Sequence, residues 1–408
     1  MKRIKVAFFA ENLIDDFDGA SRAVFQILNR IPEDEFEFMY FTAVPPQNGK
    51  EVKGEIFQFR SVPIPSNETY RMGLPYLSKK AMWAALDAFQ PDVIHFTSPS
   101  PCATYAKKYG KEKGVPVIAI YHTHFITYVK YYFRKMKWLT PLCEGIVRRI
   151  TYNLYNDLER VYVPTHEIIK DLKKLANLEG NNLKLWQRGL DNELFHPNKK
   201  DPTFIKNIIG NDLPSILFVS RLVWEKNLDE LMRLYDFFEQ KGTDVNFIIA
   251  GDGIALKELQ RKMPKAYFVG ALGHDDLSRL YASADVFYFP SDTETYGNVV
   301  IEAMASGLPC VVANSGGPKS YIRHMETGVL CAINDTEDYY KQILNLLKDK
   351  KLRNEIIYNA LEFTKPLNWD NLVDIYFDDL QKIVRSKAAV TLKKPAYLSP
   401  QIDNALMQ

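Results

Sequence analysis

Residues 286–313 read VFYFPSDTETYGNVVIEAMASGLPCVVA, and this stretch decides the fold class. It opens on a short apolar run, Val286–Phe289, and closes on another, Cys310–Ala313. Between them lie a polar loop and a segment of helical period, Asn298–Ala305. Short β-rich runs that alternate with helical segments are typical of βαβ units, whose strands are parallel. The stretch therefore predicts an α/β protein.

The same alternation continues outward over both halves of the chain. We therefore expect two series of parallel strands, each covered by its own helices. The predicted strands are Ile4–Ala10, Val93–Phe96, Val115–Tyr121, Arg160–Val163, Ser215–Ser220, Asn246–Ala250, Ala266–Val269, Val286–Phe289 and Cys310–Ala313. The predicted helices are Ser21–Arg30, Leu77–Phe89, Glu167–Ala176, Leu228–Gln240, Asp275–Ala284 and Asn298–Ala305.

The length of the chain indicates two domains, because 408 residues exceed the usual size of a single hydrophobic core. A polar, turn-rich run at 194–214 separates the two series of strands, so the domains should meet near it. We assign 1–185 to the first domain and 186–367 to the second. A helix is expected over 368–388, followed by a tail, 389–408, without any period. The helix needs a partner surface for an apolar stripe formed by Leu372, Tyr376, Leu380, Ile383 and Val384.

Charge and cysteine content exclude several classes of protein. Lys and Arg number 52 against 50 Asp and Glu, and this net charge of +2 argues against a protein that wraps nucleic acid. The four cysteines form neither a CxxC pair nor a Cys/His cluster, so we expect no disulfide framework and no zinc site. The run Val6–Ala10 ends at Glu11 and is interpreted as a strand, not a signal peptide. We expect a cytoplasmic protein that can contact the inner face of the membrane.

Two cations follow the first strand of the second half, at Arg221 and Lys226. Open α/β sheets bind ligands at the carboxyl ends of their strands, and a fixed pair of cations there suits a diphosphate. Such a pair also stabilises the charge that grows on a departing nucleoside diphosphate. Two surface cations placed by chance are the alternative.

Two carboxylates stand out in the opening stretch, because Glu294 lies in the loop after the strand and Glu302 lies on the next helix. Such groups accept hydrogen bonds from the hydroxyls of a sugar and a ribose, while free amides at a helix start meet anionic oxygens. A solvated acid is the alternative for each Glu alone. In the first half, Gly19 either opens a similar helix start or serves a tight turn. No GxGxxG fingerprint occurs, which counts against a nicotinamide or flavin dehydrogenase.

In combination these motifs resemble the retaining glycosyltransferases of family 4, which have the GT-B fold. The signature of that family is a Glu, seven intervening residues and a second Glu, followed by an Ala-rich helix and Gly-x-Pro. Glu294, Glu302 and Gly307-Leu308-Pro309 match it. Other matching segments are Arg221–Asn227, Ala250–Gly253, Phe268–Gly270, Arg188–Asp191, Pro91–His95 and Tyr121–His124.

The resemblance implies two Rossmann-like domains that face each other across a cleft, and it implies a role for each matching residue. Arg221 and Lys226 would hold the diphosphate, and Glu302 the ribose. Glu294 would grip the donor hexose, with His122 beside it as a fourth catalytic group. His124 is open to a functional and to a core interpretation. The remaining donor-binding residues would be Gly19, Gly251, Val269, Tyr296, Gly297, Asn298 and Val299.

The activity implied by the resemblance is transfer of a hexose from a UDP- or GDP-sugar to a hydroxyl acceptor, with retention at the anomeric carbon. The leaving phosphate would act as the base. Neither a cofactor nor an obligatory metal is expected, because Arg221 and Lys226 replace a cation. A sugar-nucleotide epimerase of the same shape and a non-catalytic nucleotide-sugar sensor are the alternatives.

Residues 128–149 interleave cations with aromatic side chains and resemble the lipid-glycosylating members of the family, of the mannosyl- or sulfoquinovosyl-diacylglycerol synthase kind. Such a mixture seats aromatics at headgroup level while its cations meet anionic lipid. We therefore expect a membrane lipid or a growing glycan as acceptor. An ordinary helix pair with core aromatics is the alternative. The cations are Lys130, Arg134, Lys135, Lys137, Arg148 and Arg149, against one acid, Glu144.

Overall fold

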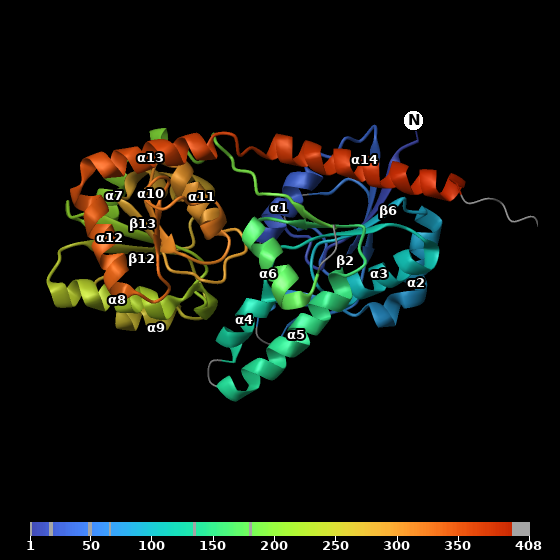
Figure 1. Ribbon diagram of the computed structural model, residues 1–408, viewed down its shortest axis with the longest axis horizontal. Coiled ribbons are helices and arrows are strands. Elements are labelled where there is room, and N and C mark those ends of the chain that lie inside the picture. Colours follow the sequence, from blue (N-terminus) through green and yellow to red (C-terminus); the bar gives the residue numbers. More distant parts are fainter. Residues whose placement is uncertain are drawn as a thin grey trace, which may run out of the picture.

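The computed structural model describes residues 2–15, 19–47, 51–64, 67–133, 136–178 and 182–393. Within these residues the chain forms two α/β domains that lie side by side, with the last helix, α14, lying along the first domain (Figure 1). Each domain is built on a parallel sheet, in the strand orders β3-β2-β1-β6-β7-β8-β9 and β12-β11-β10-β13-β14-β15. The α/β class and the GT-B architecture are therefore confirmed.

Within the described residues, the first domain combines its sheet with the helices α1 to α6, and an antiparallel hairpin (β4, β5) extends from it. Its strands are β1 (Ile4–Phe9), β2 (Phe36–Thr42), β3 (Glu55–Gln58), β4 (Ser61–Ile64), β5 (Asn67–Gly73), β6 (Val93–Phe96), β7 (Val117–Ile120), β8 (Arg160–Val163) and β9 (Leu183–Leu185). Its helices are α1 (Gly19–Leu28), α2 (Pro75–Phe89), α3 (Pro101–Lys113), α4 (Phe125–Tyr132), α5 (Thr140–Tyr155) and α6 (His166–Ala176), with a 3-10 turn, η1, at Lys137–Leu139.

The second domain repeats the plan with shorter connections. Its strands are β10 (Ser215–Val219), β11 (Asn246–Ala250), β12 (Tyr267–Gly270), β13 (Val286–Phe289), β14 (Cys310–Ala313) and β15 (Val329–Cys331). Its helices are α7 (Pro202–Ile209), α8 (Leu228–Lys241), α9 (Leu256–Lys262), α10 (His274–Ser283), α11 (Asn298–Ala305), α12 (Thr336–Lys348) and α13 (Lys350–Thr364), with 3-10 turns η2 (Pro197–Lys199), η3 (Trp224–Lys226) and η4 (Pro318–Ser320).

Both sheets reverse their strand order beside their first strand, between β1 and β6 and between β10 and β13. Ligands of open α/β sheets bind outside the carboxyl ends of the strands at such a switch point. The loops after β1 and β10 lead to Gly19 and Arg221, respectively. The topology therefore brings the two sequence-predicted loops to the two switch points.

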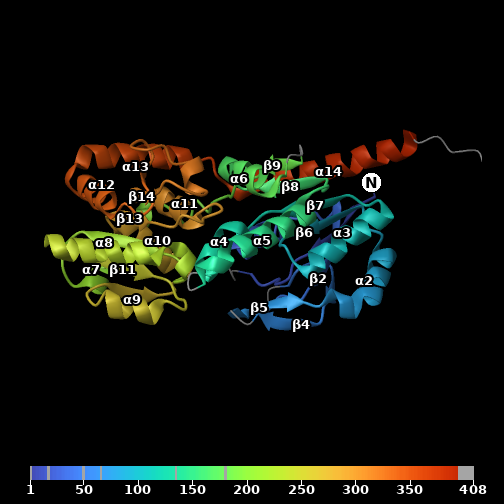
Figure 2. The ribbon, with the colours of Figure 1, turned by 60° about the horizontal axis from the view of Figure 1, so that its bottom comes forward.

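Helix α14 (Trp369–Lys393) completes the first domain, although it follows the second in sequence. It covers one face of the first sheet together with α1. Helices α2 and α3 pack on the other face, away from α14 (Figure 2). The buried stripe includes Tyr376 and Leu380, both fully buried. The expected end of this helix at 388 was too early, because α14 continues to Lys393. The remainder of the predicted tail, 394–408, lies outside the described residues.

The chain passes between the domains earlier than the polar run at 194–214. Trp186 belongs to the core of the first domain and Leu190 to that of the second. Helix α7 forms within the polar run and packs against α10, so that run belongs to the second domain. The linker between the cores is therefore the short segment 186–190.

Most predicted elements are confirmed, several with the same bounds, as at β6, β8, β11, β13, β14 and α11. Strand β2, with its sequence FEFMYFT, was missed although it is buried beside β1. Three-residue strands such as β9 and β15 were also missed, because so short a run carries no period.

Candidate active site

A cavity of about 260 Å³ opens between the two domains, at the carboxyl ends of their strands. The first domain and the linker contribute one wall and the second domain the other. The lining residues are Gly19, Ala20, Arg22, His122, Thr123, Tyr128, Arg188, Ser220, Arg221, Lys226, Glu294, Thr295, Tyr296, Gly297, Asn298 and Val299.

The two predicted cations enter this cavity from the loop after β10. Lys226 ends η3, and its nearly buried ammonium forms an ion pair with Glu294. The Arg221 guanidinium is half-exposed and lies 3.9 Å from the carboxylate of Glu225. Lys226, predicted to bind the diphosphate, and Glu294, predicted to bind the hexose, are thus in direct contact with each other. A donor that binds to both side chains must either bridge this ion pair or break it.

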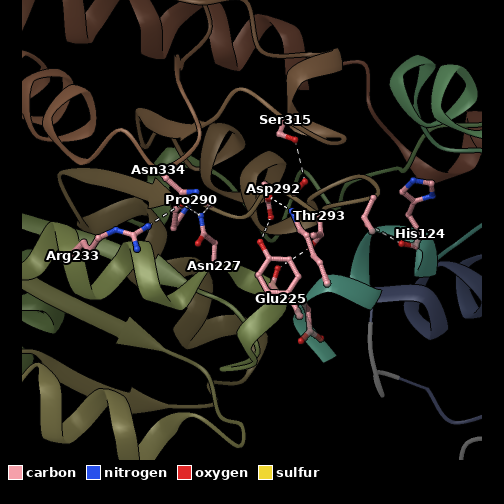
Figure 3. A network of polar contacts seen from close by, with 12 residues as sticks. His124, Glu225, Asn227, Arg233, Pro290, Asp292, Thr293, Ser315 and Asn334 are labelled. Atoms are coloured by element: carbon pink, nitrogen blue, oxygen red, sulfur yellow. Dashed lines mark hydrogen bonds and ion pairs between the residues drawn. The ribbon is translucent and has the colours of Figure 1, made fainter. Parts of the chain in front are cut away.

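The loop that carries Glu294 is fastened to its surroundings by a network of polar contacts (Figure 3). The Asn227 amide donates to the Pro290 carbonyl at 3.1 Å, and the Thr293 hydroxyl donates to the Glu225 carbonyl at 2.8 Å. The Ser315 hydroxyl donates to the Asp292 carbonyl at 3.1 Å. Because these partners come from different elements of one domain, the loop is held in a fixed position relative to η3.

Helix α11 begins at the cavity because Gly297 allows a sharp turn after the loop. Gly297 has φ +86°, and a Cβ there would lie 2.9 Å from Pro318. The free amides at the start of α11 are therefore presented to the cavity, which Asn298 and Val299 line. Gly19 approaches the same place from α1, since a Cβ there would lie 3.2 Å from the side-chain nitrogen Nδ2 of Asn298.

Glu302 lies one turn further along α11, beside an adjoining cavity of about 140 Å³. One of its carboxylate oxygens accepts from the Tyr281 hydroxyl at 3.2 Å, and the other lies 3.4 Å from the Arg22 guanidinium. Burial, and then the Glu302 carboxylate, raise the pKa of Tyr281, so its hydroxyl stays a donor. Glu302 thus joins α11 to α1 across the cleft.

His122 follows β7 and reaches the cavity, whereas His124 does not. The Arg188 guanidinium donates to Nδ1 of His122. Burial, then Arg188 and His95, lower the pKa of His122 well below its usual value. His124 is buried, Tyr121 contacts its Nδ1 at 2.8 Å, and burial lowers its pKa to about 4. The core interpretation therefore holds for His124.

Two predicted donor residues, Gly251 and Val269, lie at the ends of β11 and β12 and line none of the cavities found among the described residues between the domains. Conversely, the cavity includes residues for which we had predicted no role, above all Arg22 and Arg188. Both lie inside or beside the motifs quoted above. Only the packing of the two domains shows that their side chains reach the cleft.

A second cavity, of about 210 Å³, adjoins the first on the side of the first domain and shares Ala20, His122 and Thr123 with it. Much of its lining is apolar, and the polar groups at its wall include Glu11 and Arg71. The apolar contributors are Val24, Phe25, Met72, Pro99, Pro101 and Phe125. For metal binding, no cluster of three or more His, Cys, Asp or Glu side chains occurs in the described part of the chain.

The basic segment 128–149 is only partly a free surface. Lys130 forms an ion pair with Asp292 at 2.6 Å, and the Tyr131 hydroxyl donates to the same carboxylate. The expectation that these two side chains face a membrane is therefore wrong; they bind the second domain. Arg134 and Lys135 lie outside the described residues, and so does the side chain of Lys137. The rest of the described segment includes η1 and the first part of α5, which projects from the domain beside α4 (Figure 1).

Comparison with known proteins places this site in a class. Residues 17–194 match the model of "Glycosyltransferase Family 4", and residues 199–363 match that of "Glycosyl transferases group 1". The sucrose-phosphate synthase structure from Thermosynechococcus elongatus superposes with a TM-score of 0.73 over 94% of this chain and 100% of that one, at 17% identity. Fold and family models together define a nucleotide-sugar glycosyltransferase of the GT-B fold. Within that class, the chain belongs to glycosyltransferase family 4.

Two relatives show the similarity in sequence. Sulfoquinovosyl transferase SQD2 from Arabidopsis thaliana is 33% identical over 76% of this chain, which spans 60% of the length of that relative. A GDP-mannose-dependent alpha-mannosyltransferase from Corynebacterium glutamicum is 28% identical over 91% of this chain and 87% of the relative.

Proposed function

We propose that this enzyme transfers a hexose from a UDP- or GDP-sugar to a hydroxyl of a lipid or a growing glycan, with retention and without an obligatory metal. The observation that carries the proposal is the cavity with Arg221, Lys226 and Glu294 on one wall and His122 on the other. The cations suit the diphosphate, whose charge grows as the glycosidic bond breaks. The leaving phosphate then takes the proton of the attacking hydroxyl on the same face of the sugar.

The identity of the donor is tested first by binding. UDP- and GDP-sugars are screened for a rise in melting temperature and for hydrolysis, with wild-type protein and with Glu294→Gln. We expect one nucleotide series to stabilise the wild type and to lose the sugar-dependent part of that effect in the variant. If neither series raises the melting temperature or is turned over, the donor site is misassigned. The two relatives differ in the sugar for which they are named, so both series are needed.

The class of reaction is tested with acceptors. The second cavity gives a hydroxyl compound a place beside His122, which favours transfer over epimerisation. We expect product only when donor and acceptor are both present, and the product's anomeric proton coupling should match the configuration of the donor. Conversion of the donor to an epimer without any acceptor would instead establish the epimerase.

A lipid acceptor is favoured by the joint surface of η1 and α5. Trp138 on η1 and Leu142, Ile146 and Ile150 on α5 recur every fourth residue and are all exposed, Trp138 by 78%. Exposed apolar stripes of this kind mark interaction sites, and beside cations they suit an anionic membrane surface. Arg148, Arg149 and Lys174 line a groove between α5 and α6. This face, at the cytoplasmic side of a membrane, would bring the second cavity to the lipid.

As for spanning segments, none of the helices in the described ranges has the length and apolar character that crossing a bilayer demands.

A further inference from the structure

Arg188 occupies an unusual position, in the linker between the two domains. Its side chain is buried although it is charged, with 4% of the residue exposed. The guanidinium lies 5.7 Å from the ring centre of Trp186 in the first core. Its backbone carbonyl accepts from the Tyr296 hydroxyl of the second domain at 3.2 Å. One residue is therefore held by both domains.

The chemistry of the contact between Arg188 and His122 determines the state of the histidine ring. A guanidinium can only donate hydrogen bonds, so Nδ1 of His122 must offer its lone pair. The proton of the neutral ring then resides on Nε2. Nε2 is buried and has no hydrogen-bond partner among the described residues, so this N–H is available to an incoming acceptor atom.

The charges around His122 act in the same direction. Arg188 from the linker and His95 from β6 both lower the pKa of His122, after burial, which is the largest cause. The other charged groups that line its cavity are the cations Arg22, Arg221 and Lys226 and one acid, Glu294, which is paired with Lys226. The ring is therefore neutral over the physiological range of pH.

We propose that Arg188 is a positioning residue, which holds His122 as the neutral tautomer with its proton on Nε2 and so makes His122 a hydrogen-bond donor to an oxygen of the bound sugar. A neutral donor matters because the sugar carbon becomes positive as the glycosidic bond breaks, and an imidazolium beside it would oppose that charge. The identity of the ligand as a sugar rests on the proposed function. The tautomer of the ring does not.

The tautomer is measured directly by long-range ¹H–¹⁵N spectra of protein labelled with ¹⁵N-histidine, in which His122 is identified by its loss in His122→Gln. We expect the Nε2–H pattern in the wild type, unchanged from pH 5.5 to 8.5. In Arg188→Met the ring should populate both tautomers, while burial, the largest cause of the lowered pKa, still keeps it neutral. Arg188→Lys, which keeps a donor without an acceptor, should restore the Nε2–H pattern at least in part. A wild-type ring that is protonated on Nδ1, or that titrates near its usual pKa, overturns the proposal.

Activity supplies the second readout. Arg188→Met should lower kcat roughly 10- to 100-fold, the loss typical when the partner that orients a metal-ligating histidine is removed, with little change in the donor KM. The loss should be the same from pH 6 to pH 8, because burial keeps the ring neutral in the variant as well. Arg323→Met, at an exposed arginine of the second domain, is the control and should match the wild type. An Arg188→Met protein with wild-type kcat at every pH contradicts the proposal. A correct tautomer in a protein that turns over no nucleotide sugar would refute the proposed function alone.

Discussion

At the scale of single residues, the site consists of groups that already pair with one another. Lys226 is paired with Glu294, and Glu302 with Arg22. In each pair, a carboxylate predicted to bind the donor contacts a cation, and both cations, Lys226 and Arg22, line the cavity between the domains. Binding of a nucleotide sugar is therefore an exchange of partners, in which diphosphate and hydroxyl groups replace side chains.

Lys226→Ala should lower kcat far more than it raises the donor KM. The charge on the diphosphate grows toward the transition state, so the ammonium contributes most at that point. Loss of one such donor costs about 10²- to 10³-fold in rate. Initial rates over a range of donor concentrations separate the two constants. Lys265→Ala, at an exposed lysine paired with Glu239, is the matched control. A variant that changes only KM would assign Lys226 to ground-state binding.

Chelation tests the proposed absence of a metal requirement. Arg221 and Lys226 supply positive charge where a divalent cation would otherwise neutralise the diphosphate. We expect the rate in EDTA to equal the rate in buffer, measured on protein that was first dialysed against the chelator. The expectation is contradicted if EDTA abolishes activity and if added Mg²⁺ or Mn²⁺ restores it while removal of the chelator alone does not. Arg221 and Lys226 would then not suffice to neutralise the diphosphate.

At the scale of elements, α14 is tied to the first domain by polar as well as apolar contacts. Tyr376 donates to or accepts from Nδ1 of His95 at 2.7 Å, and the Trp186 indole donates to the Leu372 carbonyl at 2.8 Å. Asp379 accepts from Tyr162 at 2.9 Å. These partners belong to β6, the linker and β8, so α14 joins strands and linker into one unit.

The buried His95 should make the protein lose stability in acid. Burial lowers the pKa of His95 to about 3, whereas the unfolded chain has a value near 6.5. The unfolded state thus binds more protons between these values, and stability present above pH 6.5 is lost as the pH falls toward 3. From pH 7 to pH 5 the loss is about 2 kcal/mol for this residue.

Urea unfolding at a series of pH values measures this loss. His95→Gln should unfold with a weaker dependence on pH than the wild type, whatever its stability at pH 7. His166→Gln, at an exposed position on α6, should keep the wild-type dependence. Equal dependence in His95→Gln and the wild type would mean that His95 takes up its proton without unfolding.

Removal of α14 should leave the first domain poorly folded. A chain that ends before Trp369 loses the fully buried Tyr376 and Leu380, and each large buried side chain contributes roughly 2–5 kcal/mol. A chain that ends at Lys393 is the control. We expect a cooperative thermal transition only in the control. A truncated chain with the melting temperature and activity of the wild type would contradict the role of α14.

At the scale of the whole molecule, several polar contacts between described residues close the cleft. Besides the Arg22–Glu302 pair, the Arg188–His122 bond and the contacts of Asp292 with Lys130 and Tyr131, Thr165 donates to the Thr295 carbonyl at 3.5 Å. The Asp292 contacts join α4 to the loop that carries Glu294. Helix α5 packs against α4. A membrane that binds α5 would therefore lie near the closed cleft.

The proposed membrane face is tested with vesicles. The wild type should co-sediment with anionic vesicles at low salt, because cations and exposed apolar side chains of η1 and α5 act together. Trp138→Ser with Ile146→Ser should release it while donor binding stays intact. Tyr358→Ser, at an exposed position on α13 of the second domain, is the control. Wild-type protein that stays in the supernatant with anionic and neutral vesicles alike would favour a soluble glycan acceptor.

Local spacing accounts for the parts of fold and site that could be predicted. The strands around 286–313 and the pairs Arg221/Lys226 and Glu294/Glu302 each lie within one βαβ unit, so their positions follow from the period of the chain. Local spacing did not show which of His122 and His124 belongs to the site. The two lie two residues apart beyond the same strand, and only the tertiary structure shows that His122 lines the cavity and His124 does not.

The sequence by itself determined the α/β class, the family and the loops that carry the cations and carboxylates, because these depend on neighbours within a few residues. Only the tertiary structure decided the partners of those groups across the cleft. Arg22 lies 280 residues from Glu302, and Arg188 lies 66 from His122. Such contacts depend on how two separately folded domains close on each other, and that closure is set by side-chain packing along the linker and α14, which no local period records.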